Sequence, residues 1–147
     1  MQRVVRRCAD LRERRVRPVD RHRRRRRLPA RESALTSEET VRELIAAWQS
    51  NDALRASGFF APDGCYHESG RESIAGREAI AAHFTRFFRD GPVWRFAVDD
   101  VVAAGERAAV SYIFGVKGEG GVWHERAGCA WVRLRGGLVE LWREYHG

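Results

Sequence analysis

Lysine and long apolar runs are both nearly missing from this sequence. Lys117 is the one lysine among 27 basic residues, a bias typical of GC-rich coding DNA and consistent with a bacterial source. No stretch approaches the roughly 20 apolar residues that a membrane-spanning helix needs. No apolar segment follows the basic first residues, as it would in a secretion signal. These absences favour a cytoplasmic protein that does not contact a membrane.

Residue patterns that hold metals are missing as well. The three cysteines have no CxxC spacing, and no HxxxH or HExxH pattern occurs. Two adjacent pairs, His67-Glu68 and His124-Glu125, fall in expected strands, where neighbouring side chains point to opposite faces. Neither pair therefore forms a two-ligand clip, and we expect no bound metal and no cofactor.

Charge divides the chain into two parts. Residues 1–31 hold 14 arginines against three acidic residues, or +11, and the remainder holds 13 basic and 17 acidic residues, or −4; together these give +7. The run Arg23–Arg27 repels itself, so we expect residues 1–35 to be a disordered tail. The alternative is that this segment is translated from DNA upstream of a true start near Leu35 or Val41. Nucleic-acid binding would depend on residues 1–33 alone, and the acidic remainder disfavours it.

Helices are expected early in the remaining 36–147 domain. Thr36 followed by Glu39 is the pattern of a capping box, and apolar residues recur at helical spacing as far as Trp48. A later helix carries an apolar face that includes Phe84. The predicted helices cover about 36–50, 52–60 and 76–88.

The second half of the domain is rich in the β-branched and aromatic residues that favour strands. Short glycine-containing connections separate these segments, which predicts consecutive antiparallel hairpins. Pro62-Asp63-Gly64 has the chemistry of a turn. Strands are expected over 65–69, 94–104, 108–116, 122–134 and 138–145. One α+β sheet with helices on one face is the economical packing, and a strong bend would leave a pocket.

Four strings in this order resemble the SnoaL-like domains of the nuclear transport factor 2-like superfamily, which includes polyketide cyclases, ketosteroid isomerases and limonene epoxide hydrolases. The strings are AAWQSNDALRA (46–56), FFAPDGCYHESG (59–70), GREAIAAHF (76–84) and GGLVELWREYHG (136–147). The resemblance covers residues 36–147. It implies a cone-shaped, curved antiparallel sheet with three helices enclosing a largely apolar pocket, and homodimers formed through the outer sheet face.

Two carboxylates and a phenol are the candidate catalytic groups. Tyr66 and Glu68 share one face of their strand, and Glu144 shares a face of the last strand with Trp142 and His146. If both faces point into the pocket, desolvation raises the pKa of a carboxylate there and makes it a general base near neutral pH. We expect Glu68 as the base, Glu144 as the acid or orienting carboxylate, and Tyr66 as a hydrogen-bond donor.

Other side chains are assigned to the walls or to packing. The predicted substrate-contacting residues are Trp142, Trp48, His146 and Phe84. We interpret His83 as a core or boundary histidine, and Trp94, Trp123 and Trp131 as sheet-packing or dimer residues. The opposing interpretation of the carboxylates is that Glu144 pairs with an arginine and that Glu68 lies at an exposed rim.

The resemblance also bears on the reaction. Glu68 falls where ketosteroid isomerases place their proton-transferring acid, whereas their oxyanion-holding groups correspond to Leu44 and Ala127. Two further catalytic groups of limonene epoxide hydrolases correspond to Ile113 and Gly115. None of these four residues has a polar side chain that could donate a hydrogen bond or activate water. We therefore predict a pocket protein for a small apolar organic molecule, either an isomerase-, cyclase- or hydratase-like acid–base enzyme or a non-catalytic ligand-binding or dimerisation module.

Overall fold

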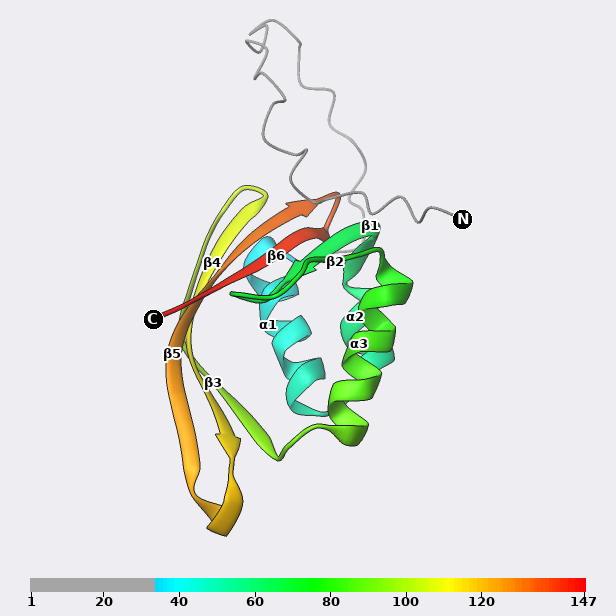
Figure 1. Ribbon diagram of the computed structural model, residues 1–147. Helices are drawn as coiled ribbons and strands as arrows, with labels where there is room; N and C mark the ends of the chain where they lie inside the picture. Colours follow the sequence, from blue (N-terminus) through cyan, green and yellow to red (C-terminus); the bar gives the residue numbers. More distant parts are fainter. Residues whose placement is uncertain (1–33) are drawn as a thin grey trace, which may run out of the picture.

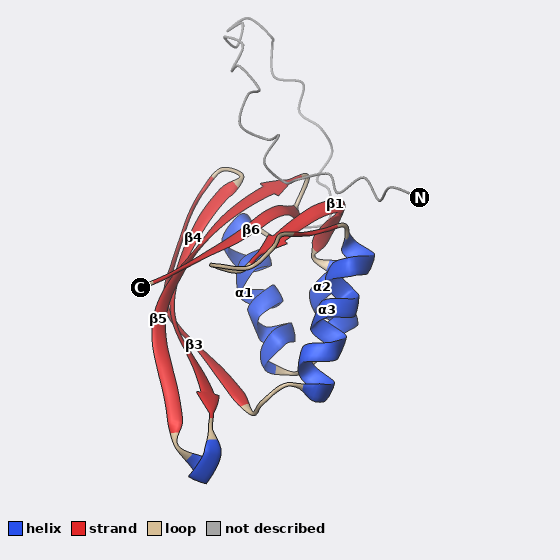
Figure 2. Ribbon diagram, in the orientation of Figure 1, coloured by secondary structure: helices blue, strands red, loops and turns tan. Residues whose placement is uncertain are grey.

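A computed structural model describes residues 34–147 of the chain (Figure 1). Three helices lie on one side of a strongly curved sheet, as the colouring of Figure 2 makes clear. The predicted α+β class and the bent sheet are confirmed. The predicted tail, 1–35, lies outside the described residues except for its last two positions.

The first two helices begin where the sequence predicted. Thr36 caps α1 (Ser37–Gln49): its Oγ1 accepts from the Glu39 N–H at 3.1 Å, and Glu39 Oε2 accepts from the Thr36 N–H at 2.7 Å. The Asp52 side chain caps α2 (Ala53–Gly58). The third helix, α3 (Arg77–Asp90), follows Gly76. Capping therefore fixes where the chain enters α1 and α2, which cover the sheet.

The sheet has six strands in the order β2-β1-β6-β5-β4-β3. The strands are β1 (Phe60–His67), β2 (Ile74–Ala75), β3 (Trp94–Ala104), β4 (Arg107–Lys117), β5 (Trp123–Arg135) and β6 (Leu138–His146), with a short 3-10 turn at Glu119–Gly121. The predicted hairpins joining β3 to β6 are confirmed. The sheet is mixed rather than wholly antiparallel, because β1 and β6 pair in parallel.

The predicted turn at Pro62-Asp63-Gly64 is instead an irregular part of β1. Pairing with β6 shifts register between Phe60 and Cys65, which bends the strand. A Cβ on Gly64 would lie 2.9 Å from the carbonyl oxygens of both Ala61 and Val139, so glycine permits this close approach. The strand therefore begins at Phe60, five residues before the predicted start.

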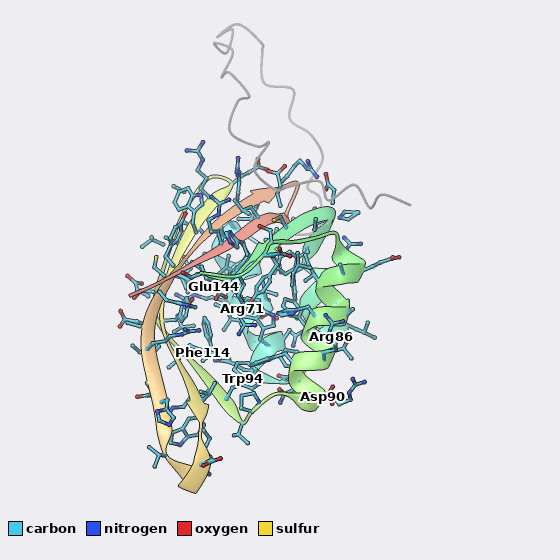
Figure 3. All side chains as sticks on the ribbon, viewed as in Figure 1. Arg71, Arg86, Asp90, Trp94, Phe114 and Glu144 are labelled. Carbon is cyan, nitrogen blue, oxygen red and sulfur yellow. The ribbon has the colours of Figure 1, made fainter. Side chains whose placement is uncertain are left out.

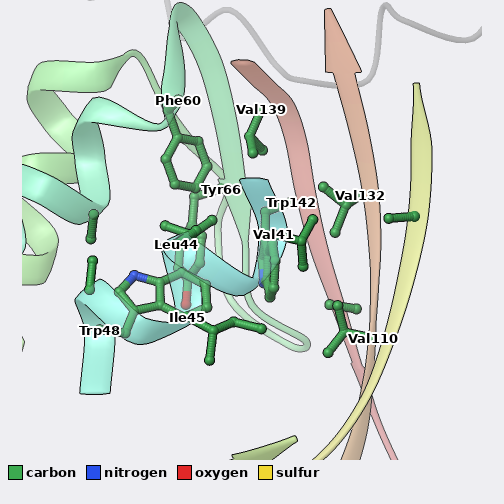
Figure 4. Packing of buried hydrophobic residues seen from close by; sticks show 14 of the residues in the cluster. Val41, Leu44, Ile45, Trp48, Phe60, Tyr66, Val110, Val132, Val139 and Trp142 are labelled. Carbon is green, nitrogen blue, oxygen red and sulfur yellow. The ribbon is translucent and has the colours of Figure 1, made fainter. Parts of the chain in front are cut away.

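The core packs between the helices and the sheet (Figure 4). Trp48 of α1 meets Trp142 of β6 edge to face, with ring centroids 4.7 Å apart, and Phe60 and Val139 pack above them. Burial of such large apolar side chains drives this packing. None of the helices within residues 34–147 has the length and apolar character of a membrane-spanning helix.

Candidate functional site

Next to this core, a cavity of about 470 Å³ lies between the sheet and the helices. Its size is within the range of about 300–1,000 Å³ that is common for small-molecule sites. Seven Trp and Phe side chains form much of its wall: Trp48, Phe84, Phe87 and Phe88 from the helices, and Trp94, Phe96 and Phe114 from the sheet. Trp94, predicted as a packing or dimer residue, stacks on Phe88 inside the cavity at 5.8 Å.

Tyr66 joins the two candidate carboxylates. Its hydroxyl lies 3.2 Å from Glu144 Oε1 and 3.3 Å from Glu68 Oε1. Burial, reinforced by the two negative charges, raises the pKa of Tyr66 well above its ordinary value. Tyr66 therefore keeps its proton and has one hydrogen to donate between two carboxylates.

Glu144 is almost fully buried, with a side-chain exposure of 10%. The Trp142 indole N–H donates to its Oε1 at 3.0 Å, and His146 Nε2 lies 3.4 Å from its Oε2. Desolvation raises the pKa of Glu144 to about 7, and the charge of Glu68 adds to this shift. The hydrogen bonds from Trp142 and Tyr66 oppose it. Glu144 is thus poised to hold or release a proton near neutral pH.

Glu68 has a different environment, at the cavity edge. Its side chain is 24% exposed, with Oε1 3.2 Å from His83 Nε2 and Oε2 3.0 Å from Arg71 Nε. The hydrogen bond with His83 lowers the pKa of Glu68 and outweighs the opposing effect of burial. Our expectation of a raised pKa at Glu68 is wrong, because His83 and Arg71 stabilise the charged form. His83 is also more than a packing residue, since it holds this carboxylate.

A second polar contact crosses the sheet next to this group. The Tyr112 hydroxyl lies 3.1 Å from His146 Nε2. Between them, on the middle strand, Gly128 pairs with both residues, and a Cβ there would lie 2.6 Å from Tyr112 Cζ. Desolvation raises the pKa of Tyr112 and lowers that of His146. Both groups are therefore neutral hydrogen-bonding partners at neutral pH.

Most of the predicted site residues come together, with one exception. Trp48, Tyr66, Glu68, Phe84, Glu144 and His146 all line the cavity. Trp142 does not: it is fully buried behind Glu144, where it positions the carboxylate. Figure 3 shows Glu144, Arg71, Phe114 and Trp94 between the sheet and α3.

Sequence reasoning missed Tyr112 and Arg126, which also line the cavity. Alternation along the central strands could have found both. Tyr112 shares a face of β4 with buried Val110, and Arg126 shares a face of β5 with buried Ala130.

The four positions matched to catalytic groups of related enzymes lie outside this cavity wall. Leu44 is fully buried in the core. Ile113, Gly115 and Ala127 alternate with inward-facing residues and lie on the outer sheet face. Hydroxyl donors in the cavity come from Tyr66 and Tyr112 instead. Over residues 34–147, no three His, Cys, Asp or Glu side chains gather in a way that could hold a metal ion.

This architecture, helices against a curved, unclosed sheet with a cavity between them, is that of the nuclear transport factor 2-like α+β proteins. A family model for the SnoaL-like domain matches residues 41–142, and the chain belongs to this family. No curated protein matches the chain.

Solved structures agree with this fold. A protein with a ketosteroid isomerase-like fold from Catenulispora acidiphila, solved with trimethylamine, is 22% identical with a TM-score of 0.65, covering 75% of this chain and 86% of that one. A nuclear transport factor 2-like protein from Cytophaga hutchinsonii is 14% identical with a TM-score of 0.66, covering 80% and 95%. An epoxide hydrolase of the LEH-like type from M. tuberculosis is 18% identical with a TM-score of 0.67, covering 76% and 82%. At these identities the similarity concerns the fold alone.

Proposed function

We propose that this protein is a cofactor-independent acid–base enzyme that acts on a small apolar organic molecule in the cavity. The observation that carries the proposal is the position of Tyr66, within hydrogen-bonding distance of two carboxylates whose pKa values shift in opposite directions. Two titratable groups with diverging pKa values are what an acid and a base in one site require. The reaction class is isomerisation, cyclisation or hydration.

The roles follow from the environments. Glu68 is ionised at neutral pH and lies at the cavity edge, so it accepts a proton from the substrate. Glu144, with its pKa near 7, donates a proton or holds the developing charge. Tyr66 stays protonated and donates a hydrogen bond. The aromatic walls hold the apolar body of the substrate and limit its contact with water.

Similar folds support a small-molecule ligand. The Catenulispora acidiphila protein was solved with a small organic amine, and the M. tuberculosis protein is an epoxide hydrolase. We further propose that the protein acts as a homodimer in the cytoplasm of a bacterium. The alternative function is non-catalytic ligand binding, which is favoured by the fact that Glu68 is already held by Arg71 and His83.

Proton abstraction can be tested before the natural substrate is known. A panel of small apolar ketones and enones is incubated with the protein in D₂O, and deuterium incorporation next to the carbonyl is followed by NMR. We expect exchange to be faster than in buffer and to fall by about 10²–10⁴-fold in Glu68→Gln, the usual contribution of a general base. Glu72→Gln, an exposed neighbour, is the matched control.

Thermal unfolding of each variant checks that the fold is retained. If deuterium exchange is unchanged in Glu68→Gln, Glu68 is not the general base. Ligands that bind without any exchange favour the non-catalytic alternative.

A further inference from the structure

The charged side chains that line the cavity differ in how they are paired. Glu68 is paired with Arg71, and Glu125 is paired with Arg95 at 2.5 Å. Glu144 is buried and bonded to neutral donors. Among the lining side chains that the structure describes, this leaves Arg126 as the arginine that forms no salt bridge. A ligand that enters this cavity therefore meets a guanidinium group that no carboxylate already holds.

Arg126 lines the cavity at an exposed position. It faces inward on β5, opposite Phe114 of β4, and its guanidinium carbon is 5.8 Å from the Phe114 ring centroid. Arg126 is exposed, whereas Ala130, which faces the same way four residues further along β5, is fully buried. The inward row of β5 thus runs from a charged rim to an apolar interior. The charge of Arg126 also lowers the pKa of Glu144 and of His146, so it acts on groups inside the cavity.

We propose that the ligand is a small apolar carboxylic acid, whose body packs against the aromatic walls and whose carboxylate pairs with Arg126. This inference rests on the proposed function, that the cavity binds a small molecule, and names the class of that molecule. The planar guanidinium suits a carboxylate because it can donate two parallel hydrogen bonds.

An amine is the opposing candidate, since aromatic walls and carboxylates also attract cations. The carboxylates are not free to pair with a ligand ammonium group. Glu68 already accepts from Arg71 and from His83. Glu144 lies at the buried end of the cavity, bonded to Tyr66 and Trp142. An ammonium group in the cavity would also be repelled by the positive charge of Arg126. The charges in place therefore favour an acid over an amine.

Three probes of one shape separate these cases: 2-naphthylacetate, 2-(2-naphthyl)ethanol and 2-(2-naphthyl)ethylammonium. Their dissociation constants are measured by calorimetry at neutral pH with the full chain and with two variants, Arg126→Gln and Arg86→Gln. Arg86 is exposed on α3 and outside the cavity wall, which makes it the matched control. All three proteins keep residues 1–33, so any general attraction of anions to the arginines there cancels in the comparison.

We expect the acid to bind about fivefold or more tightly than the alcohol, as suits a charge-assisted hydrogen bond that is partly exposed to water. Arg126→Gln removes this preference, and Arg86→Gln keeps it. An acid that binds no better than the alcohol, or a preference that survives Arg126→Gln, overturns the inference and leaves the proposed function standing. Tightest binding of the ammonium probe overturns it in favour of an amine. Failure of all three probes to bind counts against the proposed function itself.

Discussion

At the scale of single residues, two glutamates in one site have pKa values that shift in opposite directions because their environments differ. Glu144 is enclosed and accepts hydrogen bonds from uncharged donors, so desolvation dominates. Glu68 lies at the edge, where His83 and Arg71 stabilise its charge. The sequence predicted that two carboxylates would share the site, one as the base and one as the acid or orienting group. It could not predict which pKa would be raised, because that depends on depth and on neighbours distant along the chain.

The raised pKa of Glu144 predicts a pH dependence of stability. Between about pH 4.5 and 7 the folded protein holds a proton on Glu144 that the unfolded chain has released. The free energy of unfolding therefore falls as pH rises through this range and levels off above it. We expect the wild type to lose about 2 to 3 kcal/mol between pH 5 and pH 8 relative to Glu144→Gln, which cannot ionise.

Urea unfolding of both proteins at several pH values measures this difference. Glu119→Gln, in the exposed turn before β5, controls for the loss of any one carboxylate. Parallel curves for the wild type and Glu144→Gln would contradict a raised pKa at this position.

At the scale of elements, the register of β4, β5 and β6 builds the polar part of the site. Tyr112, Gly128 and His146 lie opposite one another on three neighbouring strands. Because Gly128 has no side chain, the Tyr112 ring lies across it and reaches His146. Strand existence and hairpin order were predictable from local composition. The Tyr112–His146 contact was not, because it requires three registers at once.

Gly128→Ala tests this arrangement. Its new methyl group would lie 2.6 Å from Tyr112 Cζ, so the ring must move and the contact with His146 lengthens. We expect a loss of about 1–3 kcal/mol in the free energy of unfolding, as for other overpacked sites. Gly58→Ala is the matched control, because a Cβ at Gly58 meets nothing within 4 Å. Urea unfolding of both variants gives the comparison, and equal stability would contradict a tight fit over Gly128.

At the scale of the whole molecule, the parallel pairing of β1 with β6 brings Tyr66 beside Trp142, two residues before Glu144. These strands are far apart in the sequence, and no local pattern indicates that they pair. The sequence therefore predicted a wholly antiparallel sheet. The curvature of the sheet also determines how deeply each side chain is buried. Alternation correctly assigned Glu144 and His146 to one face, but it placed Trp142 in the cavity wall, whereas the bend of the sheet buries it in the core.

The outer face of the sheet carries exposed apolar side chains. Trp131 of β5 is 41% exposed, Tyr145 of β6 is 53% exposed and Ile113 of β4 is 36% exposed. All three point away from the cavity, because they alternate with inward-facing Ala130, Glu144 and Tyr112. Exposed aromatic side chains on a broad sheet are typical of protein–protein contact sites.

We therefore expect the wild type to form a dimer that Trp131→Arg weakens by about thirtyfold, the effect of losing an aromatic anchor worth about 2 kcal/mol. Leu54→Arg is the matched control, because Leu54 is 79% exposed on α2, away from the sheet. Sedimentation equilibrium over a range of concentrations measures the association of all three proteins. A monomeric wild type, or equal weakening by both substitutions, would show that this face is not the interface.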